Sequence, residues 1–318
     1  MTTPTTPRLR GAFTALVTPF TADGALDEQA LRGLVAWQAR AGIDGLVPCG
    51  TTGETPTLSL EERERVVATT LETLVHEGAR SSVTVVAGTG SNDTAATIRA
   101  TRRAASMGAD AALVVAPYYN RPDSRMLEAH FRAIADEGDL PIVVYNVPSR
   151  TGSNVDAATL LRLAAHPRVI AVKEASGNLD QIATILRDRP AGFAVLSGDD
   201  AWTLPMLALG GDGVVSVASN EIPAEMAGLC AAARSGDWDA ARRAHERWLP
   251  LFQANFRGGP NPVAVKAAVA MMGRIEDRLR LPLLPLEEPY RSTLHALLGE
   301  AGLLDRFGTR VAAATVAA

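Results

Sequence analysis

Eight short apolar runs recur along the chain, separated by stretches with helical periodicity. The runs cover residues 13–20, 44–50, 83–90, 111–119, 141–148, 169–176, 193–200 and 213–220. Most are nearly continuous in Val, Ile, Leu and Ala rather than alternating with polar residues, as in parallel strands that are covered on both faces. Because helical stretches follow the runs, the pattern predicts eight strand–helix units.

The helical stretches carry local start signals. Ser59 and Glu62 form a capping-box pattern ahead of the apolar positions Val66, Val67 and Leu71. Eight strand–helix units within roughly the first 235 residues match the size and number of a (β/α)8 TIM barrel. A doubly wound parallel sheet is the alternative, but the chain lacks both a G-x-G-x-x-G after the first run and a G-x-x-x-x-G-K-[ST] motif. We therefore predict an α/β fold of the TIM-barrel class.

After the eighth run the pattern becomes purely helical, over 222–248, 262–272 and 286–304. We predict a catalytic barrel at 10–235, a C-terminal helical extension at 236–305 and a flexible tail at 306–318. The tail is expected because its last residues are small and apolar and carry no helix caps.

Composition excludes several classes of protein. The 318 residues are 47% hydrophobic and 21% charged, as in an ordinary globular chain. The net charge of -4, with scattered basic residues, gives no source for nucleic-acid affinity. The N-terminus lacks the apolar core of a secretory signal and no apolar run approaches the ~20 residues that span a bilayer, so we expect a cytoplasmic protein. Two cysteines and five histidines without metal-ligand spacing predict no metal site.

Lysine is rare in this chain. Of 31 basic residues only Lys173 and Lys266 are lysines, and the other 29 are arginines, a bias that an arginine-preferring genome explains. Lys173 lies in the apolar run 169–176, where an ammonium is costly to bury unless it is paired or deprotonated. A neutral amine there can attack a ketone to form a Schiff base. An ion pair with Glu174 is the alternative, although adjacent strand residues point to opposite faces. Lys266, in an apolar helix start, is expected to extend its ammonium to the surface.

Polar residues follow the predicted strands at the end where barrel active sites lie. Tyr145, one strand away from Lys173, is the expected proton shuttle. The glycine-flanked pair Thr51 and Thr52 offers hydroxyl and backbone N–H groups for a carboxylate. Arg150, in a Pro-Ser-Arg-Thr-Gly loop, could clamp a second carboxylate. Each of these residues, taken alone, has an ordinary structural explanation as well.

Several motifs in order resemble those of the dihydrodipicolinate synthase and N-acetylneuraminate lyase family. They are ALVTPF at 15–20, GTTGE at 50–54, YYNRP at 118–122, YNVPSRTG at 145–152, VKEASGN at 172–178, LSGDD at 196–200, GVVSV at 213–217 and LPL at 281–283. The resemblance covers about residues 10–305. It implies a pyruvate-dependent Schiff-base enzyme that needs no metal or redox cofactor.

The closest branch of the family condenses pyruvate with L-aspartate 4-semialdehyde, the first committed step toward diaminopimelate and lysine. By this resemblance Lys173 is the Schiff-base lysine and Tyr145 the proton donor. Thr51 and Tyr119 would complete the proton relay, with Tyr119 supplied by a neighbouring subunit. The resemblance also implies a homotetramer built from tight dimers.

The same resemblance assigns the substrate-binding residues. Thr52, Gly198 and Val215 would line the pyruvate pocket, and Arg150 would bind the carboxylate of the semialdehyde. A related lyase or dehydratase of sugar acids is the alternative, and it should have hydroxyl-binding groups in place of Arg150. A non-catalytic barrel would lack an essential group of the mechanism, whereas all motif positions are filled here.

Two departures from the family pattern qualify these expectations. The segment 256–264 reads FRGGPNPVA, with one residue inserted and Ala264 in place of a proline, so we expect the helical extension to pack differently. Lysine-inhibited relatives carry a His and a Glu in their effector site, where this chain has Arg63 and Ala96. We therefore expect weak or absent feedback inhibition by lysine.

Overall fold

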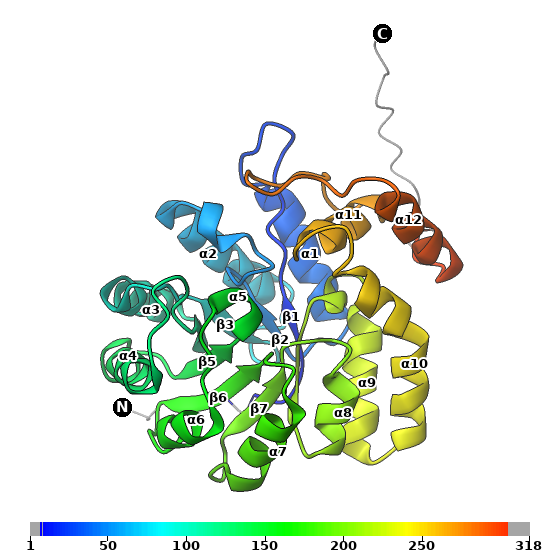
Figure 1. Cartoon of the computed structure of the whole chain (residues 1–318). Helices are drawn as coiled ribbons and strands as arrows, with labels where there is room; N and C mark the ends of the chain where they lie inside the picture. Colours follow the sequence, from blue (N-terminus) through cyan, green and yellow to red (C-terminus); the bar gives the residue numbers. More distant parts are fainter. Residues whose placement is uncertain (1–6, 8, 305–318) are drawn as a thin grey trace.

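A closed barrel of eight parallel strands forms the centre of the molecule, as predicted (Figure 1). The computed structural model describes residue 7 and residues 9–304. The strands are β1 (Gly11–Ala15), β2 (Gly45–Val47), β3 (Thr84–Gly88), β4 (Ala111–Val115), β5 (Ile142–Asn146), β6 (Val169–Glu174), β7 (Ala194–Ser197) and β8 (Gly213–Ser216). They pair in chain order, and β8 closes the ring by pairing with β1.

Helices cover the outside of the barrel. They are α1 (Glu28–Arg40), α2 (Leu60–His76), α3 (Thr94–Met107), α4 (Ser124–Glu137), α5 (Pro148–Thr151), α6 (Ala157–Ala164), α7 (Leu179–Asp188), α8 (Thr203–Ala208) and α9 (Pro223–Ser235), with 3-10 turns at Thr55–Thr57 and Ala218–Asn220. The predicted capping box is present at α2, where Ser59 and Glu62 each accept from the other's backbone N–H. Local sequence signals therefore set the start of this helix.

Three further helices form the C-terminal part, α10 (Trp238–Ala254), α11 (Val263–Met271) and α12 (Tyr290–Glu300), on one side of the barrel (Figure 1). The predicted helical stretch 222–248 is in fact divided between α9 and α10, because Gly236 adopts a left-handed conformation at the end of α9. The division of the chain at residues 235 and 236 stays a prediction. The predicted tail, 306–318, lies outside the described residues. In the described part of the chain, no helix is long and apolar enough to cross a membrane.

The strands separate two apolar layers. One fills the barrel interior and includes Tyr145 and Leu196, and the other lies between strands and helices and includes Val144 and Val172. Side chains alternate between the two layers because successive strand residues point to opposite faces. Lys173 pairs in register with Tyr145 on one side and Leu196 on the other, so its side chain points into the barrel.

Candidate active site

Lys173 and Tyr145 lie side by side inside the barrel, near the carboxyl ends of β6 and β5. The Lys173 Nζ is 4.3 Å from the centroid of the Tyr145 ring. Both residues are buried, with exposed fractions of 5% and 6%. A buried amine on the face of a phenol is placed where Tyr145 can exchange protons with a group that forms on the nitrogen.

Glu174, the next residue along β6, faces away from Lys173. Its carboxylate accepts from the Ser176 backbone N–H at 2.7 Å, from Asn146 Nδ2 at 3.0 Å and from Gln181 Nε2 at 3.4 Å. Burial raises the pKa of this carboxyl from its ordinary value. The hydrogen bonds of Glu174 therefore lie on the helix side of the sheet, and the alternative of a Lys173–Glu174 ion pair is wrong.

Gly198 directly follows β7, and Val215 lies in β8. A Cβ on Gly198 would lie 3.2 Å from the Lys173 Cε and 2.7 Å from the Ala175 Cβ. Glycine is therefore the only residue type that fits at position 198 without displacing these neighbours. Val215 belongs to the interior apolar layer together with Tyr145. The chain directly after β7 thus approaches the lysine side chain closely.

The Thr51–Thr52 turn follows β2 at the same end of the barrel. Thr51 lines a cavity of about 250 Å³. Thr52 is 2% exposed, and its Oγ1 accepts a hydrogen bond from Asn261 Nδ2 at 2.9 Å. The two threonines therefore differ, since Thr51 reaches the cavity and the Thr52 hydroxyl contacts the C-terminal part of the chain.

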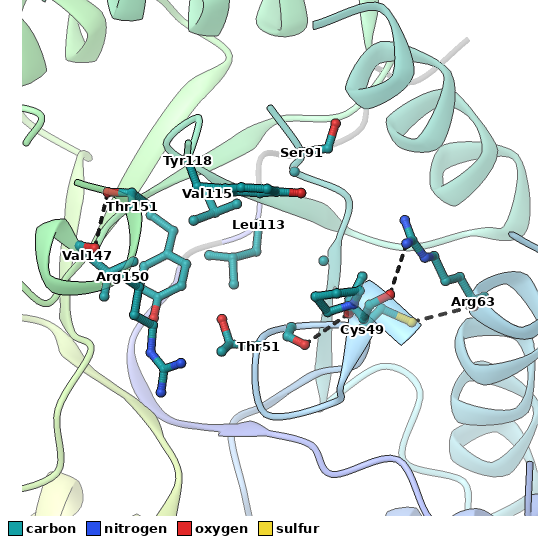
Figure 2. A pocket seen from close by; sticks show the side chains of 16 residues that line it. Cys49, Thr51, Arg63, Ser91, Leu113, Val115, Tyr118, Val147, Arg150 and Thr151 are labelled. Carbon is teal, nitrogen blue, oxygen red and sulfur yellow. Dashed lines mark hydrogen bonds between the residues drawn. The ribbon is translucent and has the colours of Figure 1, made fainter. Parts of the chain in front are cut away.

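Tyr145, Arg150 and Tyr118 also line this cavity, and the last two can be seen in Figure 2. Arg150 lies on α5, and its guanidinium Nη2 is 3.5 Å from the Asn261 backbone oxygen. Figure 2 shows Arg150 and Thr51 at the edge of the same cavity. A guanidinium at this opening suits a substrate that carries a carboxylate.

Tyr119 does not join the other predicted residues within one chain. Its side chain is 91% exposed, and its backbone has a left-handed φ of 71°. Tyr118, the preceding residue, lines the cavity instead. The left-handed turn therefore directs Tyr119 outward from its own barrel.

A model of the dihydrodipicolinate synthetase family matches residues 8–301. The chain belongs to this family. Two relatives named 4-hydroxy-tetrahydrodipicolinate synthase support the assignment. That of Koribacter versatilis is 52% identical over 93% of this chain and 97% of the relative, and that of Maridesulfovibrio salexigens is 47% identical over 93% and 99%.

Solved structures of the dihydrodipicolinate synthetase family match the whole barrel and the C-terminal helices. The dihydrodipicolinate synthase of Thermotoga maritima is 42% identical, with a TM-score of 0.90 over 94% of this chain and 100% of that one. A structure described as the first monomeric variant of dihydrodipicolinate synthase is also 42% identical, with a TM-score of 0.89 over 93% and 98%. A monomeric variant therefore occurs among proteins with this fold.

Lys266 does not extend to the surface, and this expectation from the sequence is wrong. It is 0% exposed, and its Nζ donates to Glu54 Oε1 at 2.6 Å and to the Thr18 backbone oxygen at 2.9 Å. The ammonium also lies 4.3 Å from the centroid of the Phe20 ring. Burial lowers the pKa of Lys266, and the Glu54 carboxylate opposes this shift. Helical periodicity could not reveal the pairing, because its partner is 212 positions away.

Other groups near the site fit a structural role. Burial raises the pKa of Cys49 to about 12, so its thiol stays protonated in the core. Among the residues that the structure describes, no group of three or more His, Cys, Asp or Glu side chains could hold a metal ion. Sequence reasoning missed Asn261, which contacts both Thr52 and Arg150. Its place directly before a Pro at the start of an apolar helix was the available signal.

Proposed function

We propose that this chain catalyses the Schiff-base condensation of pyruvate with L-aspartate 4-semialdehyde, an early step toward diaminopimelate and lysine. The observation that carries the proposal is the buried Lys173 amine against the Tyr145 ring. The relatives named 4-hydroxy-tetrahydrodipicolinate synthase support the choice of substrates. We place the reaction in the cytoplasm, in keeping with two buried free cysteines.

The first chemical step is attack of the neutral Lys173 amine on the ketone carbon of pyruvate. The nitrogen loses one proton and the ketone oxygen gains one, and the resulting hydroxyl takes a second proton from Tyr145 and leaves as water, which gives a protonated imine. Loss of a methyl proton converts the imine to an enamine, whose carbon attacks the aldehyde of the second substrate. The amino group of that substrate then replaces Lys173, which closes a ring and frees the lysine.

Tyr145 supplies protons to these steps, and Thr51 and Tyr119 carry them to and from solvent. Tyr119 of a neighbouring subunit takes this place, because Tyr119 points away from its own barrel. The proposed assembly is a homotetramer of tight dimers, in which each subunit of a dimer supplies its Tyr119 to the site of the other subunit.

Mixing two inactive variants tests the exchange of Tyr119. A dimer of one Lys173→Ala subunit and one Tyr119→Phe subunit contains one site with both Lys173 and the Tyr119 of its neighbour. We expect refolded mixtures to recover up to about a quarter of the wild-type rate, while each variant alone stays inactive or nearly so. No recovery in a mixture shown to contain heterodimers would exclude the exchange.

The substrate-binding residues divide between the two substrates. Thr52, Gly198 and Val215 line the place of pyruvate next to Lys173, and Arg150 binds the carboxylate of the semialdehyde. A lyase of sugar acids would need hydroxyl-binding groups where Arg150 stands. A panel of aldehyde acceptors separates the two functions, since only the semialdehyde gains from the guanidinium.

The deciding experiment is borohydride trapping with pyruvate, followed by intact mass and peptide mapping. We expect one adduct on Lys173 in the wild type and none in Lys173→Ala. An adduct on Lys266, or no adduct at all, would overturn the assignment of the nucleophile. Consumption of the semialdehyde in the presence of pyruvate then identifies the second substrate.

A further inference from the structure

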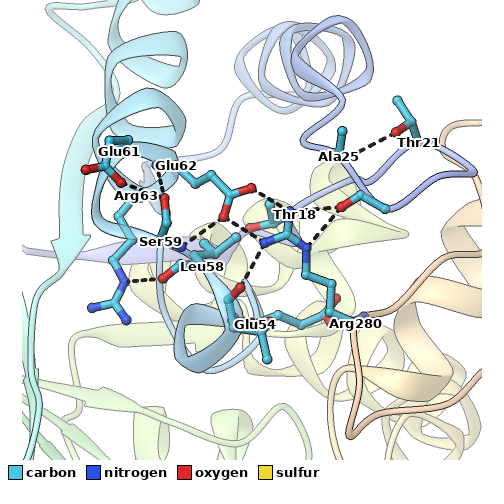
Figure 3. A network of polar contacts seen from close by, with 12 residues as sticks. Thr18, Thr21, Ala25, Glu54, Leu58, Ser59, Glu61, Glu62, Arg63 and Arg280 are labelled. Carbon is cyan, nitrogen blue, oxygen red and sulfur yellow. Dashed lines mark hydrogen bonds and ion pairs between the residues drawn. The ribbon is translucent and has the colours of Figure 1, made fainter.

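Glu54 directly follows the Thr51–Thr52–Gly53 turn and is held by the C-terminal part of the chain. It is 2% exposed and has a left-handed φ of 54°. One carboxylate oxygen accepts from Lys266 Nζ at 2.6 Å, and the other accepts from the Arg280 backbone N–H at 3.0 Å. Figure 3 shows the Arg280 guanidinium against Glu62, to which it donates at 2.7 Å.

The contacts of Lys266 and Asn261 meet on the same turn. Lys266 also donates to the Thr18 backbone oxygen, and the Thr18 hydroxyl in turn donates to the Gly53 backbone oxygen at 2.8 Å. Asn261, five residues before Lys266, donates to Thr52 Oγ1 at 2.9 Å. Three consecutive residues of the turn, 52, 53 and 54, are thus fixed from outside, and the residue before them, Thr51, lines the cavity.

Stability alone does not account for the Lys266–Glu54 pair. Both side chains are almost fully buried, at 0% and 1% exposure. The cost of removing two charges from water offsets much of their attraction, and apolar pairs of similar volume are often as stable. A left-handed backbone at Glu54 is also unfavourable for a residue with a Cβ. What the pair does provide is a unique geometry for the turn, because a carboxylate accepts its donors only in defined directions.

We propose that Lys266 and Glu54 are positioning residues that hold the Thr51 hydroxyl in line with Tyr145, so that helix α11 is part of the catalytic apparatus. The inference rests on the proposed function, in which Thr51 carries protons. Lys266 and Glu54 do not touch substrate. They act through the turn, and their loss lowers the rate of proton transfer while pyruvate still forms the imine at Lys173.

A double-mutant cycle between Thr51 and Lys266 tests this. Thr51→Val should lower kcat by about 10²-fold, the usual loss for a positioned proton-transfer group. Lys266→Met should lower kcat by at least about tenfold with unchanged KM for pyruvate and unchanged borohydride trapping. If Lys266 acts through Thr51, the double variant is no slower than Thr51→Val alone. Losses that multiply would overturn the inference, because a general loosening of the fold would act independently of Thr51.

Two further double variants distinguish the proposed effect on kcat from a loss of stability. Glu54→Gln combined with Lys266→Met removes both charges, leaves neither unpaired, and should lower kcat like Lys266→Met. The matched control is the ion pair of Arg80 with Asp110 at 2.8 Å, which lies at the amino ends of β3 and β4, at the opposite end of the barrel from the turn. Arg80→Met with Asp110→Asn should lower the melting temperature without lowering kcat. If borohydride traps no pyruvate on the wild-type protein, the proposed function is wrong. If pyruvate is trapped but the losses of kcat in Thr51→Val and Lys266→Met multiply in the double variant, only this inference is wrong.

Discussion

Replacing Gly198 by Ala places a methyl group directly against the base of the proposed nucleophile. The new Cβ would lie 2.7 Å from the Ala175 Cβ, against 3.4 Å for ordinary contact, so Ala175 has to retreat by the difference, about 0.7 Å. The same Cβ would lie 3.2 Å from the Lys173 Cε. Overpacking of this kind costs roughly 1–3 kcal/mol of folding free energy. Misplacement of a reacting group by about 1 Å can cost about 10²-fold in rate.

We therefore expect Gly198→Ala to lower kcat/KM by about 10²-fold and to slow imine formation with pyruvate, measured by timed borohydride quenching. Urea unfolding reports the loss of stability separately. Gly33→Ala in α1 is the matched control, because its added Cβ meets no atom within 4 Å beyond its chain neighbours and the backbone of its own helix. It should be neutral or stabilising by up to about 1 kcal/mol, since Ala favours helix. Wild-type rates of imine formation in Gly198→Ala would refute the close approach of β7 to Lys173.

Four other predictions follow from single side chains. Tyr145→Phe should lower kcat by about 10²-fold or more, and an unchanged kcat in steady-state kinetics would contradict a role as proton shuttle. Arg150→Ala should spare imine formation and raise KM for the semialdehyde, whereas a rise confined to pyruvate would count against the carboxylate clamp. Submillimolar lysine should not inhibit, because Arg63 and Ala96 offer no carboxylate for its amino group; half-inhibition in that range would show otherwise. Burial raises the pKa of Asp200 to about 6 from an ordinary 3.8, so the folded state binds the proton more tightly, and stability is lost as pH rises from about 4 through 6. Relative to wild type, Asp200→Asn should therefore gain about 3 kcal/mol of unfolding free energy between about pH 4 and pH 7, and a difference that is constant across urea titrations would exclude this ionisation.

Local signals account for most of the fold. The apolar runs and the capping box at Ser59 act over a few residues, and they suffice for eight strand–helix units. The strand order of the barrel then follows from short connections between consecutive parallel strands. Lys173 and Tyr145 become neighbours for the same reason, because β5 and β6 pair in register.

The sequence by itself determined the barrel, the start of α2 and the end of the barrel at which the polar residues gather, because periodicity and capping depend only on near neighbours. Only the tertiary structure decided which way Tyr119 points, how closely Gly198 approaches Lys173 and that Lys266 is buried against Glu54. These features depend on single backbone torsions and on packing between segments as much as 212 positions apart, for which a linear pattern carries no signal. Lys266, which the sequence placed at the surface, is stabilised in the core because the Glu54 carboxylate converges on it with the Thr18 carbonyl and the Phe20 ring, from two segments far from it in the chain.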